Sequence, residues 1–236
     1  MGCPTPEELV KEFQKRLIEW GRKNYVNWPW RRDRTPYRVL IAELLLKRTT
    51  RQAAAREYPK FLAKFPDIEN IHKASFDEVR EAFLPLGLYN QRAKQLKELA
   101  QVVVEKYGGK IPSDIETLKK LPGINDYIAG AVLSFGFGRL APIPDANVLR
   151  IMARVTGFSR SSAGGRRKIY RVLERLVPKD RHVEFNYALL DLGGSACHYQ
   201  WPKCKECPLR DFCVYGAEDE KRRGCLERRY QELARG

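Results

Sequence analysis

Apolar residues recur at intervals of three or four positions through most of the chain, which is the spacing that places them on one face of an α-helix. The first such run follows a capping sequence at positions 5–8 and carries Val10, Phe13, Leu17 and Trp20 on one side. Every element that this pattern predicts is a helix. Further helices are expected at about 36–50, 50–64, 75–84, 90–107, 115–121, 126–136, 146–155, 168–177 and 183–195, and the charged segment 218–236 is expected to be helical as well.

The stretch from 114 to 154 predicts two helices joined by a tight hairpin. The first helix, 115–121, is amphipathic and is stopped by Pro122 and Gly123. Asp126 is the expected N-cap of the second helix. A hairpin of this kind points backbone amides from helix N-termini at one spot, which suits a phosphate group of any nucleotide sequence.

Two carboxylate residues lie at positions where a negative charge suggests a specific role. Glu43 lies in the middle of the 36–50 run, which is apolar nearly all round and therefore predicts a buried helix. A buried carboxylate is costly unless it is paired or used, so Glu43 has either a salt bridge, with Arg38 or Arg92, or a functional role. Asp145 directly precedes the 146–155 run and is a candidate N-cap, a role worth about 1 kcal/mol to folding.

The cysteines form the strongest pattern in the chain. Four of them are separated by six, two and five residues, namely Cys197, Cys204, Cys207 and Cys213. A loop this small can hold four thiolates around one metal centre, either an iron–sulfur cluster or zinc. Disulfides are not expected in a reducing compartment. The remaining two, Cys3 and Cys225, fall outside the pattern and are expected to have no role.

The charge balance favours a polyanionic partner. The 236 residues include 44 Lys and Arg against 29 Asp and Glu, a net charge of +15. A highly charged thermophile surface is the alternative, since 31% of the residues are charged, but the hairpin favours nucleic acid. There is no apolar run of about 18 residues and no signal peptide, so a cytoplasmic, DNA-associated protein is expected.

Several of these features together resemble one family. The sequence LPGI at 121–124, followed by Asn125, with Asp145 eighteen residues after Tyr127, resembles the helix-hairpin-helix DNA glycosylases. The family usually has glycine at Asn125, and asparagine tolerates the left-handed conformation expected there. The cysteine spacing resembles the [4Fe-4S] loop of endonuclease III and adenine-DNA glycosylases, which implies a [4Fe-4S] cofactor rather than zinc.

The resemblance covers about 5–215 and implies an all-α fold of two helical lobes with an active-site cleft between them. The implied parts are a six-helix lobe at 29–138 that contains the hairpin, an iron–sulfur lobe at 1–28 and 139–216, and a charged tail at 217–236.

The resemblance also implies which residues meet DNA. The segment with Glu43 is similar to one that ends, in adenine-DNA and thymine-mismatch glycosylases, in two polar residues entering the DNA, here Lys47 and Arg48. The loop with Leu88 is similar to the intercalating loop of endonuclease III, although stapling of the next helix is the alternative. The hairpin residues expected to bind phosphate are Gly123 and Asn125.

Tyr127 distinguishes the subtypes. Its position is lysine in bifunctional relatives, commonly serine in adenine-DNA glycosylases and tyrosine in thymine-mismatch glycosylases. The resemblance therefore implies a monofunctional base-excision-repair enzyme that hydrolyses the N-glycosidic bond of flipped thymine or uracil opposite guanine.

In that reading Asp145 stabilises the positive charge that develops on the sugar, and Glu43 acts on the departing base. The partner is double-stranded DNA with a mismatched base, and the protein is expected to be a monomer. Two alternatives stay open: an adenine-DNA glycosylase without its domain for inspecting oxidised guanine, and a non-catalytic DNA-binding module with an iron–sulfur cluster.

Overall fold

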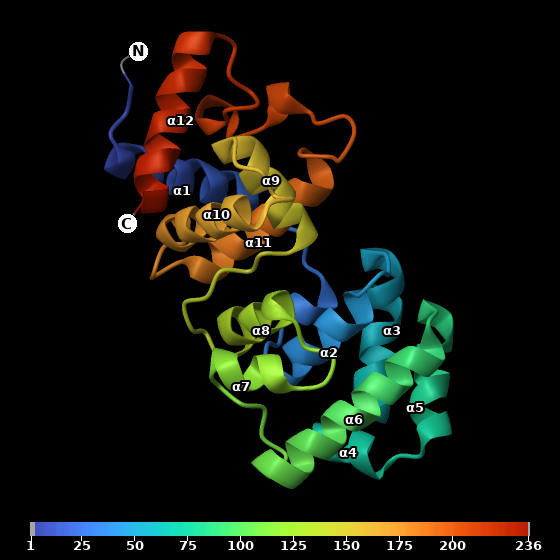
Figure 1. Cartoon of the computed structure of the whole chain (residues 1–236). Helices are drawn as coiled ribbons and strands as arrows, with labels where there is room; N and C mark the ends of the chain where they lie inside the picture. Colours follow the sequence, from blue (N-terminus) through green and yellow to red (C-terminus); the bar gives the residue numbers. More distant parts are fainter. Residues whose placement is uncertain (1–2, 236) are drawn as a thin grey trace. The chain divides into compact units, whose positions relative to one another are not determined.

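The protein is built from α-helices and short helical turns (Figure 1). The computed structural model describes residues 3–235, and within that range there is no β-strand, so the all-α prediction is confirmed. No helix in the described range is long and apolar enough to cross a membrane. The chain divides into two compact units, Asn27–Arg139 and a second unit that contains residues 3–26 and 140–235.

The Asn27–Arg139 unit is continuous in sequence and is organised around one buried helix. Its elements are η1 (Pro29–Arg31), α2 (Pro36–Leu46), α3 (Arg51–Lys64), α4 (Ile68–Lys73), α5 (Phe76–Phe83), η2 (Leu84–Leu86), α6 (Tyr89–Tyr107), α7 (Ile115–Lys120), α8 (Asp126–Ala131) and a π-helical turn, η3 (Val132–Gly136). Helix α2 packs against α3, α8 and η3, and its residues 39–45 are all buried. Gly136 allows the closest approach, since a Cβ there would lie 2.7 Å from Cα of Pro36.

The second unit brings the two ends of the chain together. Its elements are α1 (Pro6–Lys23), α9 (Ala146–Thr156), α10 (Ala163–Leu176), α11 (His182–Ser195), the short turns η4 (Cys204–Glu206) and η5 (Arg210–Phe212), and α12 (Glu220–Arg235). Helix α1 lies against α11, α10 and α12, as the blue and red ribbons of Figure 1 show. Gly21 permits this contact, because a Cβ there would meet the Cβ of Ala188 at 2.5 Å.

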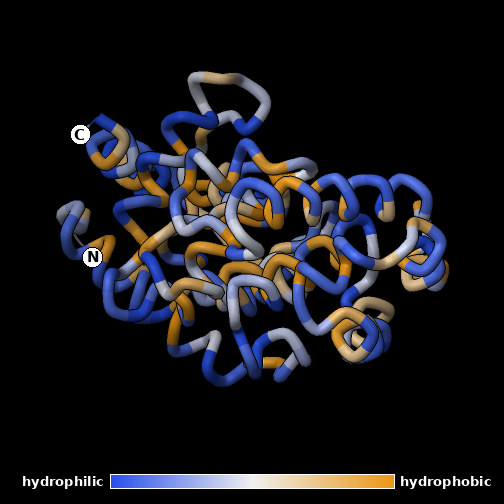
Figure 2. Tube along the Cα trace, turned by 90° about the horizontal axis from the view of Figure 1, so that it is seen from below, coloured by the Kyte–Doolittle hydropathy of each residue, from blue (hydrophilic) through white to orange (hydrophobic). Residues whose placement is uncertain are grey.

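Most predicted helices are present, with shifts that tertiary packing explains. Along the helices hydrophobic and hydrophilic positions alternate at short intervals (Figure 2). The capping box of Thr5 and Glu8 starts α1 as expected, but the buried face is centred on Leu9 instead of Val10. Helix α2 ends at Leu46, four residues before the predicted limit, and α4 was not predicted because its apolar run is too short to show a period.

The charged C-terminal segment is an integral part of the second unit. It forms α12, which packs on α10, α1 and α9 and buries Leu226, Tyr230 and Leu233. The Tyr230 hydroxyl donates to the Phe212 carbonyl at 2.6 Å, beside the cysteine loop. A segment expected as a tail is therefore a packed helix, because the few apolar residues among its charges all fall on one face.

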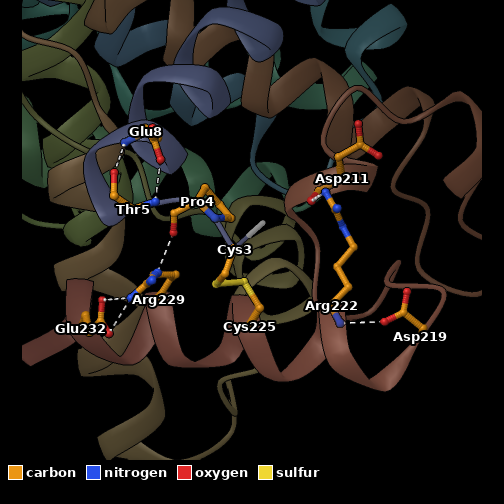
Figure 3. Close-up of a disulfide and its surroundings, with 10 residues drawn as sticks. All are labelled: Cys3, Pro4, Thr5, Glu8, Asp211, Asp219, Arg222, Cys225, Arg229 and Glu232. Carbon is orange, nitrogen blue, oxygen red and sulfur yellow. Dashed lines mark hydrogen bonds and ion pairs between the residues drawn. A yellow bond between two sulfur atoms is a disulfide. The ribbon is translucent and has the colours of Figure 1, made fainter. Parts of the chain in front are cut away.

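Cys3 and Cys225 form a disulfide, with their Cα atoms 5.8 Å apart (Figure 3). The expectation that these two cysteines have no role was wrong, because sequence spacing says nothing about residues brought together by folding. The bond closes a loop of 222 residues, which in a chain-entropy treatment stabilises the fold by up to about 5 kcal/mol. The Arg229 guanidinium also donates to the Pro4 carbonyl at 2.6 Å, so the segment before α1 is fixed to α12.

Candidate active site

The predicted hairpin joins α7 to α8, but the residue with the left-handed backbone and the residue that caps α8 are not the ones expected. Gly123 holds the left-handed conformation, with φ of 78°. Asn125 has an extended backbone, with φ of −107°, and is the N-cap: its side-chain oxygen accepts from the backbone N–H of Ile128 at 2.9 Å. The predictions of a left-handed Asn125 and of Asp126 as the cap were therefore wrong. Asp126 is the first residue of α8 and pairs with Lys119 at 3.2 Å.

Tyr127 and Glu43 both belong to the Asn27–Arg139 unit. Tyr127 is half-buried in the first turn of α8, and Glu43 is only 6% exposed in α2, the helix that packs on α8. The two arginines considered as partners for Glu43 have other partners. Arg38 pairs with Asp33 at 2.6 Å, and Arg92 donates to backbone carbonyls and to Thr49. The salt bridge considered from the sequence is not made by either arginine.

Asp145 is the N-cap of α9, as predicted. One carboxylate oxygen accepts from the backbone N–H of Val148 at 2.5 Å, and the other accepts from the Asn147 amide at 3.0 Å. Arg150 donates to the oxygen of the same amide at 2.8 Å, which fixes its orientation. Burial raises the pKa of Asp145 above its ordinary value, and these hydrogen bonds and the Arg150 charge oppose that rise only in part.

Gly193 of α11 keeps this arrangement compact. A Cβ at that position would lie 2.8 Å from the Cβ of Asn147, and the Gly193 carbonyl accepts from Arg150 at 2.9 Å. Neither Asn147 nor Arg150 was singled out in the sequence, because an Asn and an Arg within an amphipathic helix read as ordinary surface residues. Asp145 is thus an oriented carboxylate held by Val148 and Asn147, and Arg150 in turn holds Asn147.

The residues expected to enter DNA lie on two turns with unusual backbone conformations. Arg48, after α2, has φ of 54°, and Leu88, before α6, has φ of 51°. They are the only non-glycine residues with positive φ within residues 3–235. Lys47 and Arg48 are exposed, and Leu88 is 48% exposed. Backbone strain of this kind is concentrated at functional sites, so both turns are candidates for contact with a ligand.

The four cysteines of the predicted loop line one cavity between α9, α11 and the turns η4 and η5. Its other walls include Ile151, Val155, Leu192 and Leu209. All four thiols are free and half-buried, and the Arg154 guanidinium donates to the sulfur of Cys197 at 3.3 Å. Thiols are the donor type that soft metals and iron–sulfur clusters prefer.

Burial disfavours the thiolate form of two of these four cysteines. Burial raises the pKa of Cys207 to about 11 and that of Cys213 to about 12. The side chains do not stand at metal-binding distances: within residues 3–235 no three His, Cys, Asp or Glu side chains form a group that could hold a metal ion. The four cysteines thus share one cavity, and their role as ligands of a metal centre stays a prediction.

Comparison with known proteins places the chain in a family. A model of the HhH-GPD superfamily, described as base excision DNA repair protein, matches residues 41–179. A thymine-DNA glycosylase of Aeropyrum pernix is 41% identical over 89% of this chain and 96% of that protein. A thymine/uracil-DNA glycosylase of Methanothermobacter thermautotrophicus is 36% identical over 87% and 93% of the two chains.

A solved structure of a thermostable thymine-DNA glycosylase matches with a TM-score of 0.84 and 34% identity, and covers 89% of this chain and 97% of that one. Sequence and fold agree over nearly the whole length of these relatives. The protein belongs to the HhH-GPD superfamily of base excision DNA repair proteins.

Proposed function

We propose that the protein removes thymine or uracil opposite guanine from double-stranded DNA, by hydrolysis of the N-glycosidic bond, and leaves an abasic site. Tyr127 carries this proposal, because it stands in the first turn of α8, where bifunctional relatives have a lysine. Tyrosine has no amine with which to form a Schiff base, so the attacking group is water and the strand stays intact. The names of the A. pernix and M. thermautotrophicus relatives agree with thymine and uracil as the bases released.

Asp145 acts on the sugar. Breaking the bond leaves positive charge on the deoxyribose, and a carboxylate that is already oriented stabilises this charge or orients the attacking water. The hydrogen bonds from Val148 and Asn147 hold Asp145 in place before the reaction, so little reorganisation is needed in the transition state. The carboxylate must be ionised for this role, although burial raises its pKa.

Glu43 acts on the departing base, which becomes negatively charged as the bond breaks. Its carboxyl group is buried in α2, where a hydrogen bond is stronger than in water. The nucleotide must leave the base stack before either carboxylate can act, and a G·T or G·U mismatch is extruded at lower cost than a Watson–Crick pair. Part of the base selectivity thus comes from the DNA itself.

Two groups of residues bind the DNA in this proposal. Gly123 and Asn125 place the amides at the start of α8 against a phosphate. Lys47 and Arg48 enter the duplex from the turn after α2, and Leu88 enters from the turn before α6 and separates neighbouring bases. The excess of positive charge, +15, supports binding that weakens as salt rises.

We further propose that the four cysteines lining the cavity hold a [4Fe-4S] cluster. When bound, such a cluster cross-links the loop through iron–thiolate bonds and supplies a redox-active centre. The residues of the chain orient it: Arg154 donates to the sulfur of Cys197 and to the His198 carbonyl, which ties the loop to α9. Protein purified without oxygen should contain iron and sulfide and absorb near roughly 400 nm. A colourless protein with stoichiometric zinc would contradict the cluster.

An incision assay tests the reaction. Duplexes carrying G·T, G·U, A·G and A·8-oxoguanine pairs are incubated with the protein and then analysed with and without alkali. We expect strand breaks from G·T and G·U only, and only after alkali. Breaks mainly from A·G or A·8-oxoguanine would instead identify an adenine glycosylase, and no breaks despite tight binding would identify a non-catalytic module.

Tyr127→Lys tests the monofunctional assignment directly. The substitution places an amine in the first turn of α8, and partial burial at a helix N-terminus lowers the pKa of such an amine toward neutrality. The variant should cut mismatched DNA without alkali and be trapped on it by borohydride, whereas the wild-type protein should do neither. A folded variant that binds DNA but does neither would place Tyr127 away from the sugar.

A further inference from the structure

One buried arginine, Arg92 of α6, connects the two strained turns of the Asn27–Arg139 unit. Its side chain is 8% exposed, and its guanidinium reaches the end of α2 and the turn that follows. The acceptors are the Leu44 carbonyl at 2.8 Å, the Leu45 carbonyl at 3.4 Å, the Lys47 carbonyl and the Thr49 hydroxyl at 2.8 Å. One guanidinium therefore bonds to several points of the turn that carries Lys47 and Arg48, in addition to the turn's own hydrogen bonds from Thr49 to Leu46 and Lys47.

The backbone of Arg92 holds the other turn. Its N–H donates to the carbonyl of Leu88 at 2.9 Å, in the first hydrogen bond of α6. Leu88 occupies the N-cap position but has no side-chain oxygen to cap the helix, and its φ of 51° is unfavourable for a leucine. A strained conformation persists only where its surroundings over-determine it. The guanidinium of Arg92 thus fixes the Lys47–Arg48 turn to the first turn of α6, the helix that begins at the Leu88 turn.

The chemistry of the contacts suits a structural clamp. Within residues 3–235 the Arg92 guanidinium has no salt bridge to a carboxylate. It donates to oxygen atoms at the C-terminal end of α2, where the helix dipole is negative, and lies 5.8 Å from the centre of the Phe83 ring. A planar guanidinium reaches several fixed acceptors at once, which a lysine ammonium cannot do with the same geometry. The next turn of α6 extends the arrangement, because Gln95 lies beneath the hairpin glycine, 3.5 Å from a Cβ built on Gly123.

We propose that Arg92 is a positioning residue that joins the Lys47–Arg48 turn to the Leu88 turn, so that both enter the DNA as one preformed unit. The proposal rests on the function proposed above, in which the two turns extrude the target nucleotide. A preformed pair of turns needs no ordering when DNA binds, so its benefit appears in lesion binding and extrusion and not in the chemistry at Asp145.

The same helix offers a matched control. Lys97 lies five residues after Arg92 and caps the end of another helix, α4, by donating to the carbonyls of Ile71, His72 and Ala74 at 3.2, 2.7 and 2.5 Å. Lys97→Met and Arg92→Met therefore each remove a cation of α6 that holds helix-terminal carbonyls. Only Arg92 contacts the two turns, so a general loss of stability and a loss of positioning can be separated.

The experiment measures the affinity of both variants for a duplex with a tetrahydrofuran abasic-site analogue opposite guanine, and for the matching undamaged duplex. The analogue requires both turns to enter the DNA but contains no base to remove. Arg92→Met should lose roughly ten- to hundredfold in affinity for the analogue, the scale expected for misplaced contact groups, while its affinity for the undamaged duplex changes by less than about threefold. Lys97→Met should change neither by more than about threefold. Equal affinities for the two variants would overturn the proposal.

Two further measurements keep the result decisive. If Arg92→Met does not fold, Arg92→Lys replaces it. The affinity of Arg92→Lys for the analogue should be lower than that of the wild type and of Lys97→Met, by up to about tenfold. Combining the Arg92 substitution with Leu88→Ala should lower affinity by less than the product of the single effects, because joint positioning of the two turns brings no benefit once Leu88 is absent from one of them. A multiplicative result would overturn the coupling. If the wild type binds the analogue tightly but releases no thymine or uracil, the proposed function fails while the role of Arg92 is still decided.

Discussion

The N-termini of α8 and α9 are capped in the same way by two different residues. Asn125 and Asp145 each have an extended backbone, and each side-chain oxygen accepts from the backbone N–H three residues later, at 2.9 and 2.5 Å. As caps, asparagine and aspartate are nearly equivalent. Yet Asn125 is exposed and neutral, whereas Asp145 is half-buried and its pKa is raised by that burial.

This difference indicates that Asn125 only caps its helix, whereas Asp145 has a role beyond capping. A carboxyl group whose pKa is raised by folding stabilises the folded state more when it is protonated than when it is ionised. Its contribution to the free energy of unfolding is fully present below the pKa of the unfolded chain and is lost as pH rises through the pKa of the folded protein. At neutral pH the ionised Asp145 therefore lowers stability, although an asparagine would cap α9 equally well. A carboxylate kept at such a position indicates a need for its charge.

The largest effect is expected for Asp145→Asn. The amide keeps the cap and removes the buried charge, so base release measured in single-turnover assays should fall by at least about a hundredfold, the scale of one preorganised electrostatic group. The thermal midpoint at pH 7 should change little, because removal of the buried charge is offset by loss of the hydrogen bond from the Asn147 amide. Turnover close to wild type would make Asp145 a cap like Asn125 and would remove the distinction between the two helix starts.

The second prediction uses pH to sharpen the same contrast. Because burial raises the pKa of Asp145, single-turnover base release should decline by about tenfold per pH unit below a midpoint that lies above the ordinary aspartate value of about 3.9. Asn125 does not titrate, so affinity for an abasic-site duplex should not follow the same curve. A rate that stays constant down to pH 4 would show that the ionised form of Asp145 is not required.

Asn125→Asp makes the two caps chemically alike. The new carboxylate still caps α8, but it places a negative charge where the hairpin amides are proposed to meet a phosphate. Affinity for DNA should fall by roughly three- to tenfold at low salt, and the loss should shrink as salt screens the charge. Thermal stability should hardly change. An unchanged affinity across the salt series would mean that this hairpin does not face phosphate.

The smallest effect is expected for Asn125→Ala. Loss of the hydrogen bond to Ile128 should lower the free energy of unfolding by about 1 kcal/mol, and Asn125→Gly should lower it by only a few tenths. Denaturant titration of the three proteins gives these differences. A loss well above about 2 kcal/mol would indicate that Asn125 supports more of the hairpin than one helix start.

Features that depend on neighbours in the chain could be predicted from the sequence. The amphipathic helices follow from apolar spacing, and the cap of α9 follows from Asp145 just before an apolar run. The cavity formed by the four cysteines was anticipated by their short separations, since a small loop keeps its residues close. The buried position of Glu43 likewise follows from an all-apolar helix.

Choices between adjacent candidates were decided by the folded hairpin. Both Asn125 and Asp126 are good caps, and local preference does not separate them. The structure places the turn at Gly123, which leaves Asn125 as the first residue that can reach the Ile128 amide, and directs Asp126 toward Lys119.

Only the tertiary structure decided the contacts between residues far apart in the chain. Cys3 meets Cys225 because α1 packs beside α12, and the Arg92 side chain of α6 reaches the carbonyls at the end of α2. The sequence by itself determined most of the helical segments and the residue types that stand near their ends, although the short helix α4 was missed. It could not determine which helix ends are contacted by the same buried side chain. Such contacts depend on packing between helices that are tens of residues apart in the chain, and the spacing of residues along the chain does not predict that packing.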